Sequence, residues 1–413
     1  MRILADNSGY ALTNMGDVAM LQSGLSRLRW LWPDADIDVL TDRPERLARY
    51  VPYAHPVIYR GRDQYIARGA ILGKLGKTLK GAEDRFRSYA PVLSGRAVAW
   101  RRRMRQREWE CVVPFVERFS AADLVVATGG GFITDSFWWQ AQRVLTTLCL
   151  ASMMGKPTAM LGQGLGPITN PDLRALAAQT LGGLDLLTLR EGTAGLPLLD
   201  EMAVGRAKAI VTGDDAIEVA YSGRSESIGT GIGISLRISH YAGADEKMVD
   251  ALRPVLEAAA ARHGASLIPM PTRYNDKGED VRALRDLLGR DVPMDDSVQT
   301  PQHTIASAVS CRVVISGSYH AAVFALSVGV PVLGLAASQY YVEKFEGLSA
   351  LFGGGCETVR MDRDGWPGNL QHRISTAWAN SETLRAKLLT AAERQIGLGR
   401  AAYQKLHDIV GSP

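Results

Sequence analysis

Short apolar runs that end in glycine-bearing turns constrain the fold of this chain more than any other feature. Three of these runs have the length and composition of buried parallel strands, namely Leu124–Ala127, Ala159–Leu161 and Val313–Ile315. The turns that follow them are Gly129–Gly131, Gly162–Pro167 and Ser316–His320, and a fourth turn is Asn14–Asp17. In an open α/β sheet, ligands bind at the carboxyl ends of the strands, where backbone N–H groups and helix N-termini are exposed. We therefore predict one large cleft for an anionic, phosphate-bearing substrate.

Strand-like and helix-like segments alternate along most of the chain, and this alternation predicts parallel sheets with right-handed crossovers. The alternation restarts after a small, polar segment at residues 222–227. Because 413 residues also exceed what one core usually holds, we predict two domains. The predicted fold is α/β, with two Rossmann-like domains that face a central cleft in a glycosyltransferase-B-like architecture. The N-terminal domain comprises residues 1–224 and the C-terminal domain residues 225–413.

Apolar periodicity predicts the individual elements. The predicted strands are Arg2–Ala5, Asp36–Leu40, Leu124–Ala127, Thr158–Leu161, Asp185–Leu189, Ala209–Thr212, Ile232–Ile238, Ser266–Met270, Val313–Ile315 and Pro331–Leu335. The predicted helices include Asp17–Leu31, Phe137–Met153, Gly192–Leu199, Lys247–Ala261, Asp280–Leu288 and His320–Val328, and one begins near Pro171. Residues 60–110 show the least regular alternation of strand-like and helix-like segments. We predict that they form a basic, helical insertion in the first domain. One or two amphipathic helices are predicted over residues 381–409.

The bulk composition is that of a soluble globular protein, with 46% hydrophobic and 22% charged residues. No apolar stretch reaches the ~18 residues that a membrane-spanning helix requires. The N-terminal residues Met1–Asp6 predict a first strand rather than a signal peptide. The four cysteines are scattered and form no metal-binding or disulfide pattern, so we expect a reduced, cytoplasmic protein without a metal site.

The net charge of +4 conceals a strongly basic segment. Residues 60–107 contain 14 Lys or Arg against 3 Asp or Glu, so the rest of the chain is net negative. Such a segment is usually a solvated helical face. A second interpretation is peripheral contact with an anionic membrane surface or a lipid-pyrophosphate substrate. We do not expect nucleic acid as a partner, because no aromatic-interleaved recognition motif accompanies the arginines. The sequence leaves the oligomeric state open.

Candidate ligand-binding residues lie in the glycine-bearing turns. Gly16 permits a ligand to approach the backbone closely, and Asp17 either caps the helix or binds a sugar hydroxyl. Gly130 and Gly131 follow a strand and form either an anion-binding nest of N–H groups or a plain tight turn. Gln163 stands between two glycines at a strand exit, where its amide offers a donor and an acceptor.

Charged residues near strand ends are candidates for anion binding and proton transfer. Arg190 follows a predicted strand, where its planar guanidinium either binds a carboxylate or phosphate or pairs with Glu191. Arg237 falls inside a predicted strand, so burial of its charge requires a ligand or an acid. His320 stands at a strand-to-helix turn, where the helix N-terminus lowers its pKa and a bound phosphate raises it. Lys344 either reaches the same cleft or is a surface lysine.

The pair Asp214–Asp215 ends the last predicted strand of the first domain. Paired carboxylates serve either as acid/base groups or as helix caps and turn residues. We favour the second role for this pair.

The order of these motifs resembles that of the polysaccharide pyruvyl transferase family. The matching motifs are Asn14-x-Gly16-Asp17, Gly129–Gly131, Gly162-Gln163-Gly164-x-Gly166-Pro167, Arg190-Glu191, Gly213-Asp214-Asp215, Ser316–His320 leading into Gly329-Val330-Pro331, and Lys344. Each motif is loose by itself, but their order over residues 3–350 is more specific. The resemblance implies a two-domain, glycosyltransferase-B-like fold. It also implies transfer of pyruvate from phosphoenolpyruvate to two hydroxyls of a sugar, as a cyclic ketal, in the biosynthesis of cell-surface glycans or glycoconjugates.

The resemblance further implies roles for individual residues. His320 is the expected proton-transfer group, and Arg190, Arg237 and Lys344 are expected to hold the carboxylate or phosphate of the donor. The other expected substrate-binding residues are Asn14, Gly16, Asp17, Gly130, Gly131, Gln163 and Ser318, of which Asn14, Asp17, Gly130 and Gln163 face the acceptor. Phosphoenolpyruvate is the donor substrate, a sugar or lipid-linked sugar is the acceptor, and no cofactor is expected.

One position departs from the family pattern. The turn that contains His320 usually carries an arginine two residues before the histidine, and this chain has Ser318 there. Either another cation binds the donor anion in place of this arginine, with Arg190, Arg237 and Lys344 as the candidates, or the donor is no longer phosphoenolpyruvate.

Two other functions fit the same pattern. The alternative enzyme is a glycosyltransferase that uses a nucleotide-sugar donor on the same two-domain scaffold, with Glu346 near the donor ribose. A sugar-binding or membrane-docking protein without catalysis is the third hypothesis, and the serine in place of the family arginine motivates it.

Overall fold

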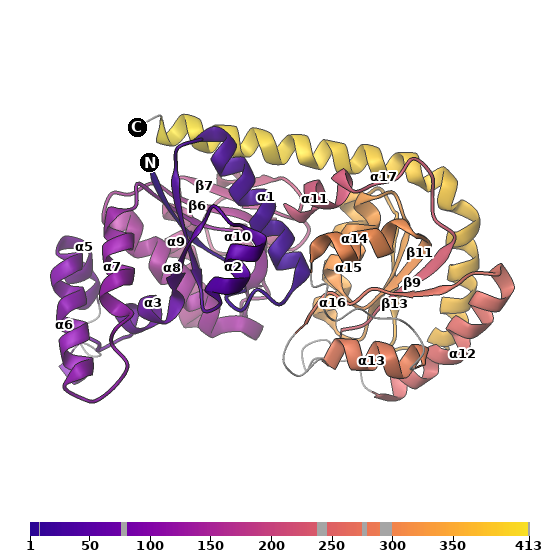
Figure 1. The fold of residues 1–413 in the computed structure, drawn as a ribbon, viewed down its shortest axis with the longest axis horizontal. Coiled ribbons are helices and arrows are strands. Elements are labelled where there is room, and N and C mark those ends of the chain that lie inside the picture. The colour runs from indigo at the N-terminus through magenta and orange to yellow at the C-terminus, as the bar shows by residue number, and fades with distance from the viewer. Residues whose placement is uncertain (8, 76–80, 238–245, 275–278, 290–299, 412–413) are drawn as a thin grey trace.

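The computed structural model describes residues 1–7, 9–75, 81–237, 246–274, 279–289 and 300–411. Residues 76–80 of the basic segment and Ile238, the predicted end of a strand, lie outside these ranges. The described residues form two parallel β-sheets, one from each half of the chain, with helices packed around them (Figure 1). The two halves lie side by side along the long axis of the molecule, and helix α17 (Trp366–Val410) runs along both.

The first half of the chain builds a parallel sheet in the order β3-β2-β1-β4-β6-β7-β8, with β5 paired to β6. Its strands are β1 (Arg2–Asp6), β2 (Asp36–Thr41), β3 (His55–Ile58), β4 (Leu124–Ala127), β5 (Gly130–Ile133), β6 (Thr158–Leu165), β7 (Leu186–Leu189) and β8 (Ala209–Val211). Its helices are α1 (Met15–Leu31), α2 (Pro44–Tyr50), α3 (Tyr59–Ile66), α5 (Ala82–Tyr89), α6 (Pro91–Arg103), α7 (Val112–Ala121), α8 (Trp138–Met153), α9 (Pro171–Gly183), α10 (Gly195–Glu201) and α11 (Ala216–Ser222). Every residue of β4 and β6 is buried, as expected for strands covered on both faces.

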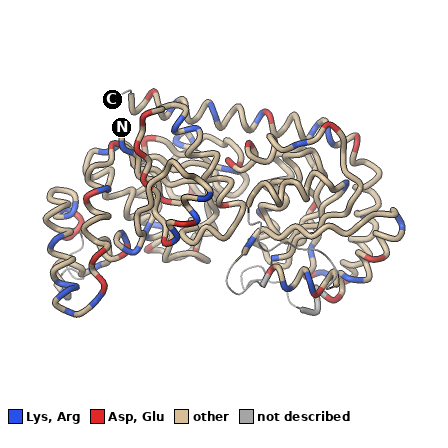
Figure 2. The backbone as a smooth tube through the Cα atoms, in the orientation of Figure 1, with Lys and Arg blue, Asp and Glu red and all other residues tan. Residues whose placement is uncertain are grey.

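The basic segment forms helices outside this sheet. The helices α3, α5 and α6 lie between β3 and β4 in the chain, where the sequence predicted a helical insertion. Helices α5 and α6 occupy the end of the molecule farthest from the C-terminal half, and Figure 2 shows Lys and Arg along them.

The second half builds a smaller parallel sheet in the order β10-β9-β11-β12-β13. Its strands are β9 (Gly231–Ser235), β10 (Leu267–Pro269), β11 (Cys311–Ser316), β12 (Val332–Ala336) and β13 (Cys356–Arg360). Its helices are α12 (Glu246–His263), α13 (Glu279–Leu288), α14 (Pro301–Val309), α15 (Tyr319–Ser327), α16 (Gln339–Leu351) and α17. Helix α15 is buried along its whole length, because its apolar residues pack in a core that also includes residues of α1 and α11.

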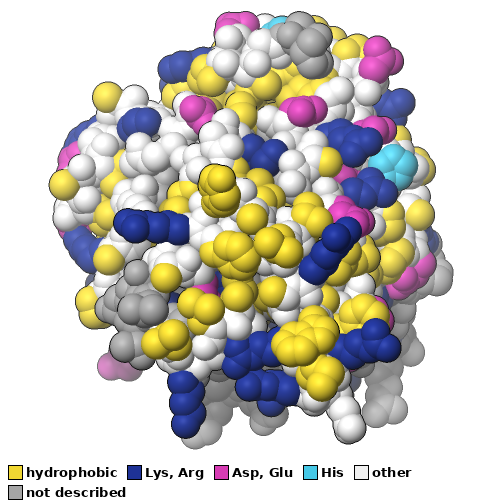
Figure 3. Space-filling view, turned by 90° about the vertical axis from the view of Figure 1, so that its left-hand side faces the viewer, with side chains coloured by type: hydrophobic (Ala, Val, Ile, Leu, Met, Phe, Trp, Pro, Cys, Tyr) yellow, Lys and Arg dark blue, Asp and Glu magenta, His cyan; other side chains and the backbone are white. Residues whose placement is uncertain are grey.

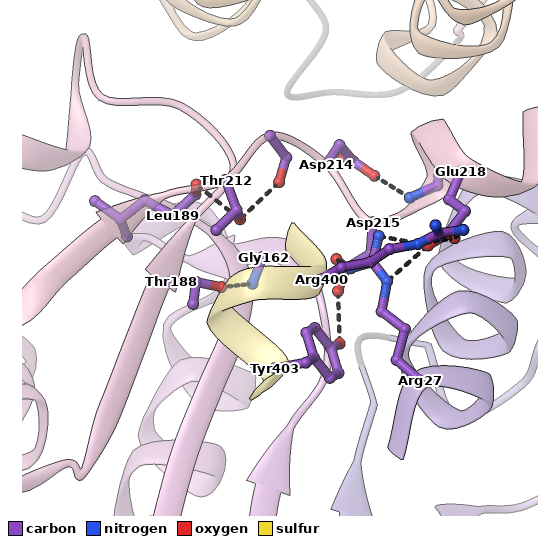
Figure 4. Close-up of polar contacts among 12 residues, drawn as sticks. Arg27, Gly162, Thr188, Leu189, Thr212, Asp214, Asp215, Glu218, Arg400 and Tyr403 are labelled. Atoms are coloured by element: carbon purple, nitrogen blue, oxygen red, sulfur yellow. Dashed lines mark hydrogen bonds and ion pairs between the residues drawn. The ribbon is translucent and has the colours of Figure 1, made fainter. Parts of the chain in front are cut away.

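Helix α17 joins the two halves, because its last turns pack on the N-terminal half. Tyr403 donates a hydrogen bond of 2.8 Å to Asp215, whose other oxygen lies 2.5 Å from Nη1 of Arg27 on α1 (Figure 4). Glu218 on α11 accepts a 2.7 Å hydrogen bond from Arg27 and also pairs with Arg400 of α17. Asp215 is thus held by two buried partners, which makes it a structural acid.

The predicted elements are largely present, with shifted ends. The predicted strand Ile232–Ile238 ends at Ser235, so Arg237 lies two residues beyond the strand rather than inside it. The one or two helices predicted near the C-terminus are a single helix that begins earlier, at Trp366. The predicted domain division at residue 224 falls between α11 and β9 and stays a prediction.

Candidate active site

The N-terminus of α1 packs against His320 of the C-terminal half. Asn14 is the N-cap of α1, and its side-chain oxygen accepts a hydrogen bond of 3.1 Å from the N–H of Gly16. Asp17 lies within the first helical turn, so the capping role considered for Asp17 belongs to Asn14. A Cβ atom on Gly16 would overlap with the imidazole of His320. The absence of a side chain at this position therefore makes room for the histidine ring.

The guanidinium of Arg190 lies in space that two glycines leave free, just beyond β7. A Cβ atom on Gly131 would lie 2.5 Å from Nη2 of Arg190, and a Cβ on Gly164 would lie 2.7 Å from its Nε. Cζ of Arg190 lies 4.2 Å from the centroid of the Tyr319 ring, a cation–π contact between the two halves. The alternative partner Glu191 instead accepts a backbone hydrogen bond of 2.9 Å at the start of the next helix.

Asp214 lies between Arg190 and His320. Its Oδ1 accepts a hydrogen bond of 2.9 Å from the N–H of Ala216 at the start of α11, which is the capping role favoured from the sequence. Its Oδ2 lies 3.8 Å from Nη1 of Arg190 and 3.7 Å from Nε2 of His320, too far for a hydrogen bond. Within the described ranges, neither this oxygen nor Nε2 of His320 has a hydrogen-bond partner. Asp214 thus belongs to the site as well as to the cap.

Positive charge is concentrated around His320. Burial lowers the pKa of His320 well below 6.5, and the charges of Arg190, Lys344 and Arg237 lower this pKa further. Burial also lowers the pKa of Lys344 well below 10.5, and the two arginines add to this shift. Burial raises the pKa of Asp214 to about 6, although the charge of Arg190 opposes the shift. An anion bound in this region would relieve the repulsion among the four basic groups.

A pocket of about 380 Å³ opens beside Arg190, between the two halves. The described residues that line it include Gly131, Gly164, Arg190, Tyr319, Tyr340 and Lys344. The Tyr340 hydroxyl donates a hydrogen bond of 3.3 Å to the carbonyl oxygen of Gly131, and Nζ of Lys344 lies 4.0 Å from the centroid of the Tyr340 ring. The pocket is the part of the predicted cleft to which Arg190 and Lys344 both contribute.

His320 lies next to this pocket rather than in its described lining. The ring of His320 meets that of Tyr319 edge-on, with 5.2 Å between the ring centroids. Tyr319 also contacts Arg190, and Nζ of Lys344 lies 5.5 Å from its ring centroid. Tyr319 therefore connects the histidine to both cations.

Arg237 and Ser318 have partners within the protein. Nη1 of Arg237 forms an ion pair of 2.7 Å with Asp280, the acid that burial of its charge required. The backbone N of Arg237 lies 3.3 Å from the position of a Cβ on Gly317, so Arg237 is adjacent to the turn that carries His320. The Ser318 hydroxyl lies 2.8 Å from that of Thr272 and is fully buried. A role for Ser318 in donor binding stays a prediction.

Gly130 and Gln163 lie inside the sheet rather than at its edge. Gly130 of β5 pairs with Gln163 of β6, and the side-chain amide of Gln163 donates a hydrogen bond to the carbonyl oxygen of Thr128. Gln163 is fully buried. Both residues support the strands that carry Gly131 and Gly164, and their predicted contact with the acceptor stays a prediction.

The sequence of this chain matches the model of the family described as polysaccharide pyruvyl transferase over residues 14–339. The chain belongs to this family. The match covers more than half of the chain and includes every site residue discussed above except Tyr340 and Lys344. As a polysaccharide pyruvyl transferase family member, the protein is an enzyme of the transferase class.

The fold of this pyruvyl transferase family member is similar to those of nucleotide-sugar enzymes. UDP-GlcNAc 2-epimerase from Neisseria meningitidis, bound to UDP-GlcNAc, has 12% sequence identity and a TM-score of 0.56 over 97% of each chain. S. aureus MnaA in a structure with UDP has 13% identity and a TM-score of 0.56, over 99% of this chain and 95% of that one. Arabidopsis thaliana UGT89C1 complexed with UDP has 12% identity and a TM-score of 0.53, over 99% of this chain and 98% of that one. These similarities establish the glycosyltransferase-B-like fold.

Two kinds of feature are absent from the part of this family member that the structure describes. No described helix is long and apolar enough to cross a membrane. No three His, Cys, Asp or Glu side chains of the described residues converge as metal ligands. The expectation that the reaction needs no metal and no cofactor stays a prediction.

Sequence reasoning did not single out the two tyrosines that complete the site. Tyr319 stands between Ser318 and His320 in a recognised turn, but aromatic residues beside a helix are usually core. Tyr340 stands four residues before Lys344, a spacing that brings both to one face of a helix. Asp214 was recognised as either an acid/base group or a capping residue, and the capping role was favoured.

Replacing Gly16 with alanine is expected to lower kcat about 100-fold, because the new methyl group displaces the ring of His320. Steady-state kinetics of the purified variant test this expectation. Gly397→Ala is the matched control, since Gly397 is exposed on α17 and its Cβ would meet no atom within 4 Å. The control should keep its kcat and gain about 0.5–1 kcal/mol of stability. A Gly16→Ala variant with wild-type kcat would show that the histidine does not require this contact.

Asp214 is expected to make the stability of this family member depend on pH. The pKa of Asp214 is about 6 in the folded protein, above its ordinary value of 3.8, mainly because the carboxyl is buried. The stabilisation associated with its proton is therefore fully present below about pH 4 and is lost as the pH rises through 6. Over this window the loss is about 3 kcal/mol.

Urea unfolding at several pH values measures this effect in wild type and Asp214→Asn. The free energy of unfolding of the wild type should fall relative to that of the variant between pH 4 and pH 7. Parallel pH profiles for the two proteins would contradict the expected shift.

Proposed function

We propose that this protein transfers pyruvate from phosphoenolpyruvate to a sugar acceptor as a cyclic ketal, in the biosynthesis of a cell-surface glycan or glycoconjugate. The observation that carries the proposal is the group of cations, Arg190, Arg237 and Lys344, whose charges all act on the buried His320. Phosphoenolpyruvate carries a carboxylate and a phosphate on one small carbon skeleton. Concentrated positive charge in a site withdrawn from water is what such a donor requires.

Arg190 and Lys344 are the proposed contacts to the charged groups of the donor. Both line the pocket, and both lie against the ring of Tyr319. The guanidinium of Arg190 matches a carboxylate or phosphate in a bidentate arrangement, whereas Lys344 acts as a point charge. Nε of Arg190 is buried and has no hydrogen-bond partner among the described residues, so it offers a donor for this purpose.

Arg237 is the proposed substitute for the family arginine that this chain lacks at Ser318. It lies beside the same turn, and its charge lowers the pKa of both His320 and Lys344. Its ion pair with Asp280 holds the guanidinium in place. In this proposal, Arg237 supplies the positive charge that Ser318 does not provide.

The proposed reaction moves two protons. The C2–O bond to phosphate breaks, two bonds form between C2 and the sugar oxygens, and the methylene carbon becomes a methyl group. Of the two hydroxyl protons, one is transferred to this carbon and the other leaves with the phosphate. His320 is neutral in the empty site because its pKa is lowered, so it can accept a hydroxyl proton. The negative charge of the bound donor raises the pKa of His320 and Asp214 and favours uptake of that proton.

The acceptor sugar is placed near the N-terminus of α1 in this proposal. Asn14 and Asp17 are partly exposed there, and the negative charge of Asp17 acts on Lys344. Carboxylates and amides are suitable partners for sugar hydroxyls. A free sugar and a lipid-linked sugar present the same hydroxyl groups to this position.

The experiment incubates the purified protein with phosphoenolpyruvate and a panel of sugar acceptors. Phosphate release is followed, and the ketal methyl group of the product is detected by NMR. In parallel, thermal unfolding is recorded with phosphoenolpyruvate, with uridine diphosphate and with guanosine diphosphate. We expect phosphoenolpyruvate to raise the unfolding temperature and an acceptor to support phosphate release.

The opposite pattern would overturn the proposal. Stabilisation by a nucleoside diphosphate without stabilisation by phosphoenolpyruvate would point to a glycosyltransferase. Glu346, considered near a donor ribose from the sequence, is exposed on α16, whereas its neighbour Glu343 lines the pocket. No stabilisation and no turnover with any donor would favour a protein without catalysis.

A further inference from the structure

The helix α6 has its large apolar residues on the outside. Leu93, Trp100 and Met104 are 61%, 66% and 67% exposed. The buried residues of α6 are Ser94, Gly95, Val98 and Ala99, all smaller than these three, and a Cβ on Gly95 would meet Val116 at 2.9 Å. A helix on the surface of a globular protein normally shows the reverse arrangement, with its large apolar residues inside.

Arginines share this outer face with the apolar residues. Leu93, Arg96, Trp100, Arg103 and Met104 are spaced three or four residues apart, so they lie along one side of the helix. All five are exposed. We call this set the α6 face. Figure 3 shows this end of the molecule, where hydrophobic and basic side chains are interspersed.

The acids of the insertion do not neutralise the α6 face. Residues 91–107 contain six Arg and no Asp or Glu. Glu83 of α5 is buried and accepts hydrogen bonds of 2.8 and 3.0 Å from the backbone N–H groups of Gly69 and Ile71. Asp84 pairs at 2.6 Å with the buried Arg87. These two carboxylates stabilise the insertion from within. Two exposed acids follow α6, namely Glu108, which pairs at 3.8 Å with Arg60, and Glu110, and the six arginines of residues 91–107 outnumber them.

Other large apolar side chains of the insertion are exposed as well. Nη1 of Arg101 donates a hydrogen bond of 2.5 Å to the carbonyl oxygen of Ile71, which holds residues 71–73 beside the helix. Leu72 and Leu75 are 43% and 58% exposed there, and Tyr89 at the end of α5 is 92% exposed. The exposed apolar residues of the insertion are therefore not confined to α6.

We propose that the α6 face docks on an anionic lipid membrane. Interspersed Trp, Leu, Met and Arg side chains match the boundary of a bilayer, where apolar groups enter the acyl region and cations contact the acidic headgroups. Nucleic acid would match the arginines but not the outward leucine and methionine. The face lies at the end of the molecule farthest from the C-terminal half, so docking leaves the pocket between the halves uncovered (Figure 1). This proposal does not depend on the pyruvyl transfer reaction.

The experiment measures co-sedimentation of the full-length protein with vesicles of phosphatidylcholine alone or mixed with phosphatidylglycerol. We expect binding to the anionic vesicles only, and weaker binding as salt is added. Two triple variants separate the two contributions: Leu93→Ser/Trp100→Ser/Met104→Ser, and Arg96→Gln/Arg103→Gln/Arg107→Gln. Arg107 is an exposed arginine that follows the α6 face in the chain. The arginine variant is expected to bind about 100-fold more weakly. Each cation near an anionic surface increases the affinity by a factor of about five, and this variant lacks three cations. The apolar variant should lose binding to a similar degree.

Matched control variants change the same residue types elsewhere. Trp30→Ser removes a tryptophan that is 76% exposed on α1, and Lys387→Gln/Arg394→Gln/Lys405→Gln removes three exposed cations of α17. Both controls should bind like the wild type, and circular dichroism should show that all variants are folded. Equal binding to uncharged vesicles, or no vesicle binding at all, would overturn the proposal. So would tight binding of RNA that the arginine variant loses, or a dimer that the apolar variant converts to a monomer.

Discussion

Replacing His320 with alanine is expected to lower kcat for pyruvyl transfer by about 10³, with little change in the affinity for phosphoenolpyruvate. A positioned acid/base group contributes about 10²–10⁴ to a rate, and no other neutral imidazole lies in the described part of the site. The charges that hold the donor, Arg190 and Lys344, remain in the variant. The measurement is the rate of phosphate release at saturating substrates, combined with calorimetric titration of phosphoenolpyruvate.

The control for this variant is His372→Ala, because His372 is exposed on α17, away from the pocket. It should have wild-type kcat. A His320→Ala variant that retains most of its kcat would exclude His320 as the proton-transfer group. A variant that loses affinity instead of kcat would show that His320 binds the donor.

Replacing Arg190 with methionine is expected to weaken phosphoenolpyruvate binding by about 10³. A bidentate contact contains two charge-assisted hydrogen bonds, each worth about 2 kcal/mol, and the sum corresponds to three powers of ten in affinity. Methionine preserves much of the apolar stem that lies on the ring of Tyr319. Calorimetric titration measures the dissociation constant.

The stability of the empty Arg190→Met variant distinguishes a binding role from a structural one. Arg190 is buried, and its nearest carboxylate atom, Oδ2 of Asp214, is 3.8 Å away. Burial of this charge is offset only by the cation–π contact with Tyr319 and by Asp214, so its removal should lower the free energy of unfolding by no more than about 1 kcal/mol. Arg394→Gln on α17 is the exposed control and should leave both binding and stability unchanged. Wild-type affinity in Arg190→Met, or a large loss of stability, would contradict the proposed role.

Local sequence features were sufficient to predict the architecture. Buried runs such as Leu124–Ala127 and turns such as Ser316–His320 determine where strands end and helices begin, because their backbone preferences act over a few residues. These predictions failed where the local signal was weak. Arg237 was placed within a strand because the apolar run continues to Ile238, whereas the strand ends at Ser235.

The order of the motifs also identified the family, since a series of loose matches in a fixed order is specific even when each match is not. The family model covers residues 14–339 and confirms this identification. The sequence placed His320 and Arg190 at the ends of strands on different halves of the chain. The sequence did not indicate how far apart these two residues lie in the folded protein.

The sequence by itself therefore determined the α/β class and most of the individual strands and helices, because these depend on neighbouring residues. Only the tertiary structure decided that Gly16 makes room for His320, that Asp214 lies between His320 and Arg190, and that Tyr319 contacts Arg190. These contacts join segments from both halves of the chain. They depend on how the two sheets and α17 pack together, which no local pattern of residues specifies.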